Sequence, residues 1–126
     1  MSLNICNMLY VEDVKKNLDF WLAIGFVEVK RQGEGREFTV VLASHEKSAA
    51  RLQLWDINYI REVSAEVAEM KPSLLFVVED LEYWHEKIST VTDTVSEINP
   101  QPFKNFNFQS PDGSYYAFAE SEIVEG

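Results

Sequence analysis

The chain has 126 residues and a mass of 14.5 kDa. That is the size of one domain or of two small fused modules, which excludes a large multidomain enzyme. Hydrophobic residues make up 46% and charged residues 25%, as in ordinary folded proteins. The formal net charge of −10 repels phosphate backbones and anionic lipid. We therefore expect neither nucleic acid nor a membrane as a partner, whereas a cationic ligand is compatible with the charge.

Cys6 is the single cysteine, so an internal disulfide framework is excluded. No segment approaches the roughly 20 apolar residues of a membrane span, and no signal peptide pattern is visible. A cytoplasmic location is therefore expected. Residues 1–3 and 125–126 are interpreted as cloning scars.

The first half of the sequence predicts a helix among four strands. Asp13 is a plausible N-cap for an amphipathic helical pattern that Gly25 ends. Apolar runs and alternation predict the strands over residues 4–11, 26–31, 37–43 and 51–55.

The second half repeats this order after a polar segment, residues 57–71, which we interpret as a linker with a few helical signals. The predicted modules are residues 4–56 and 72–121. In the second module Asp80 opens a helix, and Gly113 belongs to a strong turn signal. Strands are predicted over residues 73–78, 94–98, 103–108 and 115–119.

A short internal repeat supports a duplication. The sequence VEDV at residues 11–14 recurs as VEDL at residues 78–81, each time at a strand-to-helix junction. Since the element order also matches on both sides, an internal duplication is predicted.

Two segments resemble one known superfamily. LYVEDVKKNLDFWLAIGFVEV, from residue 9, resembles the opening strand–helix–strand of the glyoxalase/bleomycin-resistance/dioxygenase (vicinal oxygen chelate) superfamily, and QPFKNFNFQSPDGSYYAFAE, from residue 101, resembles its closing hairpin. The resemblance implies an α+β fold of two βαβββ modules. Their curved mixed sheets would enclose a concave ligand-binding cavity, with the helices on the convex side.

The resemblance also implies four positions that hold a divalent metal in part of this superfamily. They fall on Cys6, Gln53, Ser73 and Ala117. A catalytic metal needs three or four His, Asp, Glu or Cys ligands, and only Cys6 is one. No metal, no cofactor and no catalytic residue are therefore expected. Gln101-Pro102-Phe103-Lys104 resembles a phrase of the metal-free bleomycin-resistance proteins, which are dimers that bind flat cationic drugs.

Strand alternation predicts which side chains face the cavity. If Cys6 and Gln53 face it, so do Met8, Tyr10, Arg51 and Trp55, while Leu9, Val11, Leu52 and Leu54 pack under the helix. The same reasoning places Leu75, Val77, Tyr115 and Ala119 on the concave face of the second module. The candidate ligand-binding residues, chosen because pockets are mostly apolar and aromatic, are Trp55, Phe103, Gln53, Tyr115, Met8, Phe38 and Cys6.

The favoured function is that of a metal-free, homodimeric binding protein of the bleomycin-resistance type. It would sequester a small aromatic or planar cationic molecule, as in antibiotic resistance, with Trp55 and Phe103 sandwiching a planar group. Lys104 and Arg51 are the residues expected to oppose a cationic ligand. The alternatives are an enzyme of the same superfamily, metal-dependent or acid–base, and a scaffold or regulatory module with a vestigial cavity.

Overall fold

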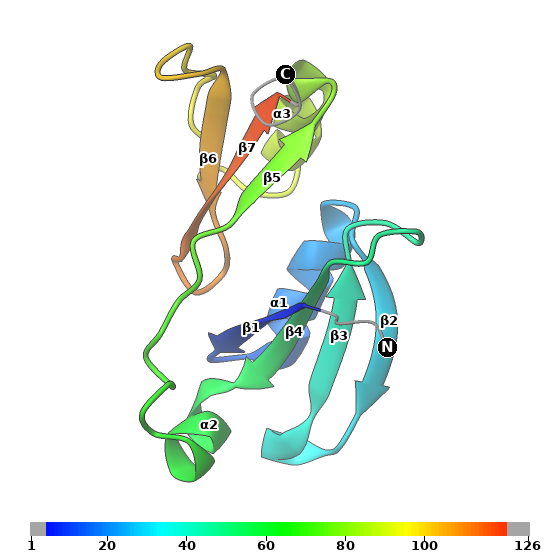
Figure 1. Ribbon diagram of the computed structural model, residues 1–126, viewed down its shortest axis with the longest axis vertical. Helices are drawn as coiled ribbons and strands as arrows, with labels where there is room; N and C mark the ends of the chain where they lie inside the picture. Colours follow the sequence, from blue (N-terminus) through cyan, green and yellow to red (C-terminus); the bar gives the residue numbers. More distant parts are fainter. Residues whose placement is uncertain (1–4, 121–126) are drawn as a thin grey trace. The chain divides into compact units, whose positions relative to one another are not determined.

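The computed structural model describes residues 5–120, so the predicted scars lie outside the described residues. The chain divides into two compact units, residues 1–72 and residues 73–126, and each contains its own sheet (Figure 1). Among the helices of residues 5–120, none is long and apolar enough to span a membrane. The α+β class is confirmed.

The first unit is built on a four-stranded mixed sheet with the strand order β1-β4-β3-β2. β1 and β4 are parallel, and the other pairs are antiparallel. A short 3-10 turn, η1 (Gly35–Glu37), precedes β3. The strand bounds are β1 Cys6–Val11, β2 Val27–Gln32, β3 Thr39–Ala43 and β4 Arg51–Asp56, which confirms the predicted βαβββ order.

Helix α1 (Val14–Ala23) begins and ends as its sequence predicts. Asp13 is the N-cap, and its side chain accepts a hydrogen bond from the Lys16 amide at 3.0 Å. At the other end Gly25 has a positive φ of 116°. The amides of Gly25 and Phe26 bond back to the carbonyls of Leu22 and Trp21, which is a Schellman motif.

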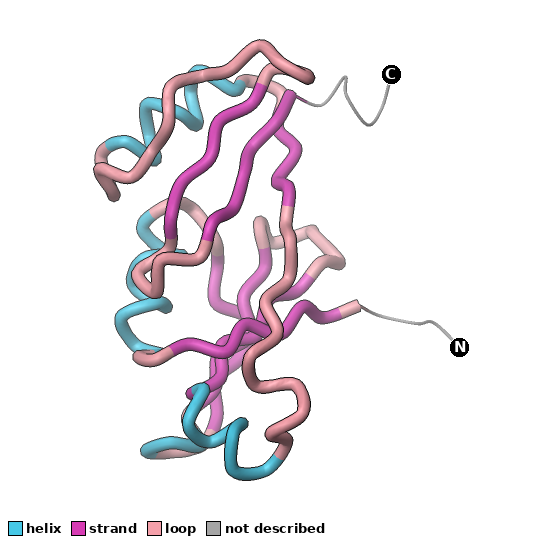
Figure 2. The backbone as a smooth tube through the Cα atoms, turned by 90° about the vertical axis from the view of Figure 1, so that its left-hand side faces the viewer, coloured by secondary structure: helices cyan, strands magenta, loops and turns pink. Residues whose placement is uncertain are grey.

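α1 covers one face of this sheet and contacts β2, β3 and β4 (Figure 2). Trp21 on the helix and Leu54, Val40 and Leu42 on the sheet are all completely buried. Leu9, Val11 and Leu52 are also buried, so the predicted core face is the one that packs under the helix.

Residues 57–71, predicted as a linker, contain helix α2 (Ile57–Val63). Asp56 ends β4 and caps this helix, since its Oδ1 accepts a hydrogen bond from the Asn58 amide at 2.8 Å. Ile57, Ile60 and Ala68 form a small buried cluster. The segment is therefore folded against the first unit through α2, which contacts β1 and β4.

The second unit repeats the arrangement with three strands in the order β5-β7-β6. β5 and β7 are parallel, as β1 and β4 are, and β7 and β6 are antiparallel. Asp80 caps the helix as Asp13 does, accepting from the Tyr83 amide at 3.1 Å. The elements are β5 Leu75–Val78, α3 Leu81–Ser89, β6 Asn105–Gln109 and β7 Tyr115–Glu120.

The strand predicted over residues 94–98 is not a strand in the structure, so the described part of the second unit has three strands instead of the four of a complete βαβββ module. The segment still lies along β6. The Asn107 amide donates to the Ser96 hydroxyl at 2.9 Å and the Gln109 amide donates to the Thr94 hydroxyl at 2.8 Å. The prediction was wrong because two side-chain hydroxyls accept where a strand's backbone carbonyls would.

The core of the second unit is aromatic. Phe106 and Phe118 stack with centroids 5.1 Å apart, and Trp84 of α3 stacks on Phe118 at 5.7 Å. His85 meets the ring of Phe106 edge-on and contacts the Ser96 carbonyl oxygen at 2.8 Å. His85 is thus a packing residue of the helix.

Candidate functional site

The face of the first sheet opposite α1, here called the open face, carries the side chains predicted to line the cavity. In the β1–β4 register Met8 pairs with Gln53 and Tyr10 with Trp55. These side chains are exposed or half-buried, whereas the alternate residues are buried. The open face is formed by Cys6, Met8, Tyr10, Thr39, Val41, Arg51, Gln53 and Trp55.

Gln53 lies near the middle of the open face and has a defined set of contacts. Its Nε2 donates a hydrogen bond to the Thr39 hydroxyl at 3.0 Å. Its Oε1 lies 3.9 Å from the Sγ of Cys6, which is a weak donor. Gln53 is therefore the polar group around which the apolar side chains of this face are arranged.

An aromatic pair closes one end of the open face. The ring of Trp55 stacks on Tyr59 of α2 with a centroid separation of 6.2 Å and an interplanar angle of 21°. Both rings, with Tyr10, pack against the α2 cluster. Trp55 is consequently half-buried, with α2 behind it, rather than standing free on the sheet.

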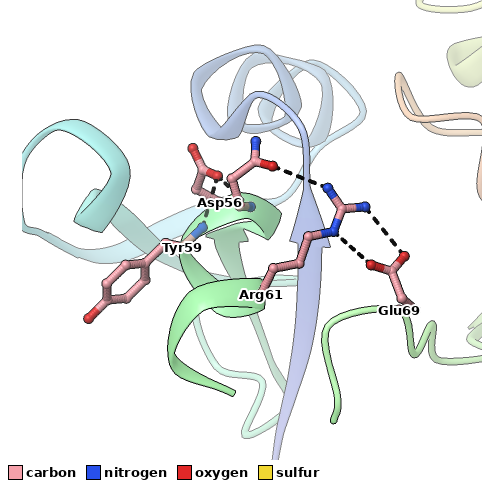
Figure 3. A network of polar contacts seen from close by, with 5 residues as sticks. Asp56, Tyr59, Arg61 and Glu69 are labelled. Carbon is pink, nitrogen blue, oxygen red and sulfur yellow. Dashed lines mark hydrogen bonds and ion pairs between the residues drawn. The ribbon is translucent and has the colours of Figure 1, made fainter. Parts of the chain in front are cut away.

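Polar contacts hold α2 in place beside this pair (Figure 3). Arg61 Nε bonds to Glu69 at 2.7 Å, and Arg61 also reaches the side chain of Asn58 at 3.1 Å. The hydrogen bond to Glu69 raises the pKa of Arg61 and lowers the pKa of Glu69. The Tyr59 ring points away from this network (Figure 3), so the aromatic and polar sides of α2 are separate.

Phe38 does not share the open face with Gln53. Because side chains alternate along a strand, Phe38 lies on the same side as Val40, which is the side that packs under α1. The Nζ of Lys15 lies 5.6 Å and the Cζ of Arg31 lies 5.7 Å from the centroid of its ring. Phe38 was a candidate ligand-binding residue, and the alternation of β3 (Thr39–Ala43) extended back by one residue places it on the helix side of the sheet, away from Gln53. Phe38 lines a cavity of about 450 Å³ formed by Glu12, Asp13, Val14, Lys15, Arg31, Gly33, Glu34, Gly35, Phe38 and Asp56.

The second unit has an equivalent open face. Leu75 pairs with Ala117, and Val77 with Ala119. Tyr115 is 64% exposed, and Leu75 and Val77 are also exposed, as predicted. Ala119 is buried, unlike its predicted neighbours. Phe103 is half-buried just before β6, so it and Trp55 lie in different units.

The two cations expected to oppose a cationic ligand are both engaged within their own units. Lys104 Nζ bonds to Glu82 and lies 3.9 Å from Glu120. The Arg51 guanidinium donates to the backbone carbonyls of Ser48 and Ala50. The two carboxylates offset the charge of Lys104, whereas the neutral carbonyls do not offset the charge of Arg51.

The four positions where the resemblance implies metal ligands do not fit a divalent metal. In the second unit Ser73 supplies a hydroxyl group, and the side chain of Ala117 has no atom that could bind a metal. In the first unit Cys6 supplies one thiol and Gln53 supplies an amide oxygen, which is fewer than the three or four strong ligands that a catalytic metal requires. Within the described part of the chain, no group of three or more His, Cys, Asp and Glu residues could hold a metal ion.

Comparison with solved structures identifies the architecture. TnmS3, an antibiotic-binding protein from Streptomyces sp. CB03234, matches with a TM-score of 0.73 and 19% identity, covering 95% of this chain and 96% of its own. A hypothetical protein from S. aureus matches with a TM-score of 0.74 and 20% identity, and the match covers 95% of each chain. Lactoylglutathione lyase from Agrobacterium tumefaciens matches with a TM-score of 0.74 and 15% identity, and the match covers 100% of this chain and 98% of its own.

The chain has the glyoxalase/bleomycin-resistance fold. Other structures that match are named as glyoxalase/bleomycin resistance proteins, from Streptomyces sp. CB03234 and from Sphaerobacter thermophilus. No family model matches the sequence, and no curated protein matches it. The fold predicted from the two quoted segments is therefore confirmed by the structure.

Within the glyoxalase/bleomycin-resistance fold, the first unit brings Cys6, Met8, Gln53 and Trp55 onto one face. Two further residues, Tyr59 and Thr39, contact this group and are not among the predicted site residues. Tyr59 was assigned to a linker, although the apolar residues Ile57 and Ile60 beside it were a helical signal. Thr39 carries no local signal for a site, because its contacts with Gln53 and Leu54 arise from the pairing of β3 with β4.

Proposed function

We propose that this chain is a metal-free binding protein that holds a small planar, aromatic or cationic molecule without transforming it. The observation that carries the proposal is the open face of the first sheet. It combines the apolar side chains of Met8, Tyr10 and Trp55 with one oriented amide, that of Gln53. A largely apolar surface with few placed polar groups is the usual composition of a small-molecule site.

Three further points support a cationic ligand. The net charge of −10 attracts cations at long range. The Trp55 ring offers a face to which a cation is attracted. Lys104 is paired with the Glu82 carboxylate, so its charge opposes a cation less than the sequence suggested, whereas Arg51 is bonded to neutral carbonyls and keeps its opposing charge.

The fold neighbours bear on the choice between sequestration and catalysis. TnmS3 is an antibiotic-binding protein, and the lactoylglutathione lyase is an enzyme, so the fold is compatible with both. A metal-dependent enzyme requires ligands that Cys6, Gln53, Ser73 and Ala117 do not supply. We therefore favour binding, with the protein acting as a cytoplasmic homodimer in resistance to its ligand.

The test is a fluorescence titration with 9-aminoacridine, a planar cation at neutral pH. We expect saturable binding that Trp55→Ala abolishes. Tyr83→Ala, which removes an exposed aromatic ring from α3, is the matched control and should bind as the parent protein does. Absence of binding to the parent protein, or equal loss with both variants, would overturn the proposal.

The same preparation tests the alternative of a metal enzyme. Protein purified without chelator should contain no stoichiometric nickel, zinc, manganese or iron by elemental analysis. One equivalent of any of these metals would contradict the metal-free proposal and favour the enzyme.

A further inference from the structure

The hydrogen bonds around Thr39 determine which way the amide of Gln53 points. The Thr39 hydroxyl donates to the carbonyl oxygen of Leu54 at 2.8 Å, and this contact is buried. A carbonyl oxygen has no proton, so the single proton of the hydroxyl is used there. The hydroxyl oxygen can then only accept, and the group that donates to it is Nε2 of Gln53, at 3.0 Å.

The opposite orientation of the amide is unfavourable for a simple reason. It would place Oε1 of Gln53 against the Thr39 oxygen, with no proton between two acceptors. Thr39 is only 2% exposed, so water has little access to it to relieve that contact. The amide orientation therefore follows from the Thr39–Leu54 bond.

The consequence lies on the open face. With Nε2 bound to Thr39, the group left for a ligand is Oε1, an acceptor with two lone pairs. Among residues 5–120, the hydrogen-bond donor that lies near Oε1 is the weak thiol of Cys6, at 3.9 Å. A ligand N–H or ammonium group would complete the hydrogen bonding of Oε1, whereas a ligand carboxylate would meet it lone pair to lone pair.

We infer that Thr39 is a positioning residue that presents Gln53 Oε1 as a hydrogen-bond acceptor, so that the ligand of this site carries a donor, an ammonium or N–H group, next to its planar part. This inference rests on the proposed function and specifies its ligand class. Two cationic side chains of the first sheet oppose it. Arg51 lies on the open face, and its charge acts on Cys6. Lys30 lies opposite Val41 on the outer strand β2, and Val41 lies opposite Gln53.

The first experiment needs no ligand. In the NMR spectrum of the ¹⁵N-labelled protein, one side-chain amide proton of Gln53 should exchange with water more slowly than the other. Thr39→Val keeps the shape but removes the hydroxyl, and should abolish that difference; Thr39→Ser should retain it. If both Gln53 protons already exchange at the rate of an exposed glutamine in the parent protein, the positioning role is overturned, whether or not the variants fold.

The second experiment compares two probes of similar shape, 2-naphthylmethylamine, which is an ammonium at neutral pH, and 2-naphthoate. We expect the parent protein to bind the amine about tenfold more tightly, a ratio that corresponds to one well-placed hydrogen bond. Thr39→Val should bring the ratio close to one, and Thr39→Ser should restore it. Lys30→Met should preserve the preference for the amine, since the preference arises at Gln53.

The outcomes separate the two proposals. Equal binding of the probes, tighter binding of the carboxylate, or an unchanged ratio in Thr39→Val would overturn the ligand class while leaving a binding protein. Failure of the parent protein to bind either probe would overturn the proposed function and the ligand class together. The amide exchange result decides the role of Thr39 in each case.

Discussion

Cys6 is the single thiol of the chain and lies on the open face beside Gln53. Burial raises its pKa above the ordinary value, and the nearby charge of Arg51 lowers it by less. Since the thiolate is the reactive form, Cys6 should react slowly with a disulfide reagent at neutral pH, and its rate should rise at higher pH than that of glutathione. Arg51→Met should move the midpoint further up. A midpoint at or below that of glutathione would contradict this.

Trp55 and Trp21 differ in burial, and this difference predicts unequal effects on stability. Trp21 is fully buried, so Trp21→Ala should lower the free energy of unfolding by about 3–5 kcal/mol in urea denaturation. Trp55 is half-buried against α2, so Trp55→Ala should cost less, about 1–3 kcal/mol.

Phe103→Ala, also at a half-buried position, should behave like Trp55→Ala. If Trp55→Ala and Phe103→Ala are each as destabilising as Trp21→Ala, both rings are core residues. The prediction that they sandwich a ligand would then be abandoned.

Among the helices and strands, the N-caps of α1 and α3 are the clearest structural evidence of the internal repeat. Asp13 and Asp80 each accept a hydrogen bond from the amide three residues later. Replacing either with alanine should lower the free energy of unfolding by about 1 kcal/mol. Asp19→Ala, which changes an exposed aspartate within α1, is the matched control and should have little effect. Equal effects of Asp13→Ala and Asp19→Ala would contradict the capping role.

The edge of the second sheet depends on side-chain hydroxyls. Thr94→Val removes the acceptor of the Gln109 amide, so that amide should exchange with solvent faster. The Asn107 amide, which donates to Ser96, should remain protected and serves as the internal control. Unchanged exchange at Gln109 would mean that the hydroxyl does not protect the edge.

At the scale of the whole molecule, the open faces of both units expose apolar side chains, including Met8, Leu75 and Tyr115. Large exposed apolar patches are rare on monomeric proteins, which is the reason for expecting a homodimer. Light scattering in dilute solution should therefore give about twice the chain mass of 14.5 kDa. A mass of one chain at micromolar concentration would contradict the proposed dimer.

Features that depend on local periodicity could be predicted from the amino-acid sequence. The alternation of β1 and β4 predicted that Leu9 and Leu54 are buried while Met8 and Gln53 are not, because successive side chains of a strand point to opposite faces. The capping positions Asp13 and Asp80 were predictable for the same kind of reason, since a cap bonds to an amide only three residues away.

Only the tertiary structure decided contacts between residues that are distant in sequence or displaced by a turn. Thr39 orients Gln53 because the β3–β4 register brings together residues that are 14 positions apart. Tyr59 stacks on Trp55 because α2 folds back on the sheet, and Phe38 meets Lys15 and Arg31 because α1 and β2 pack beside β3. Periodicity specifies which face a side chain takes within one element, whereas register and packing specify which side chains meet across elements.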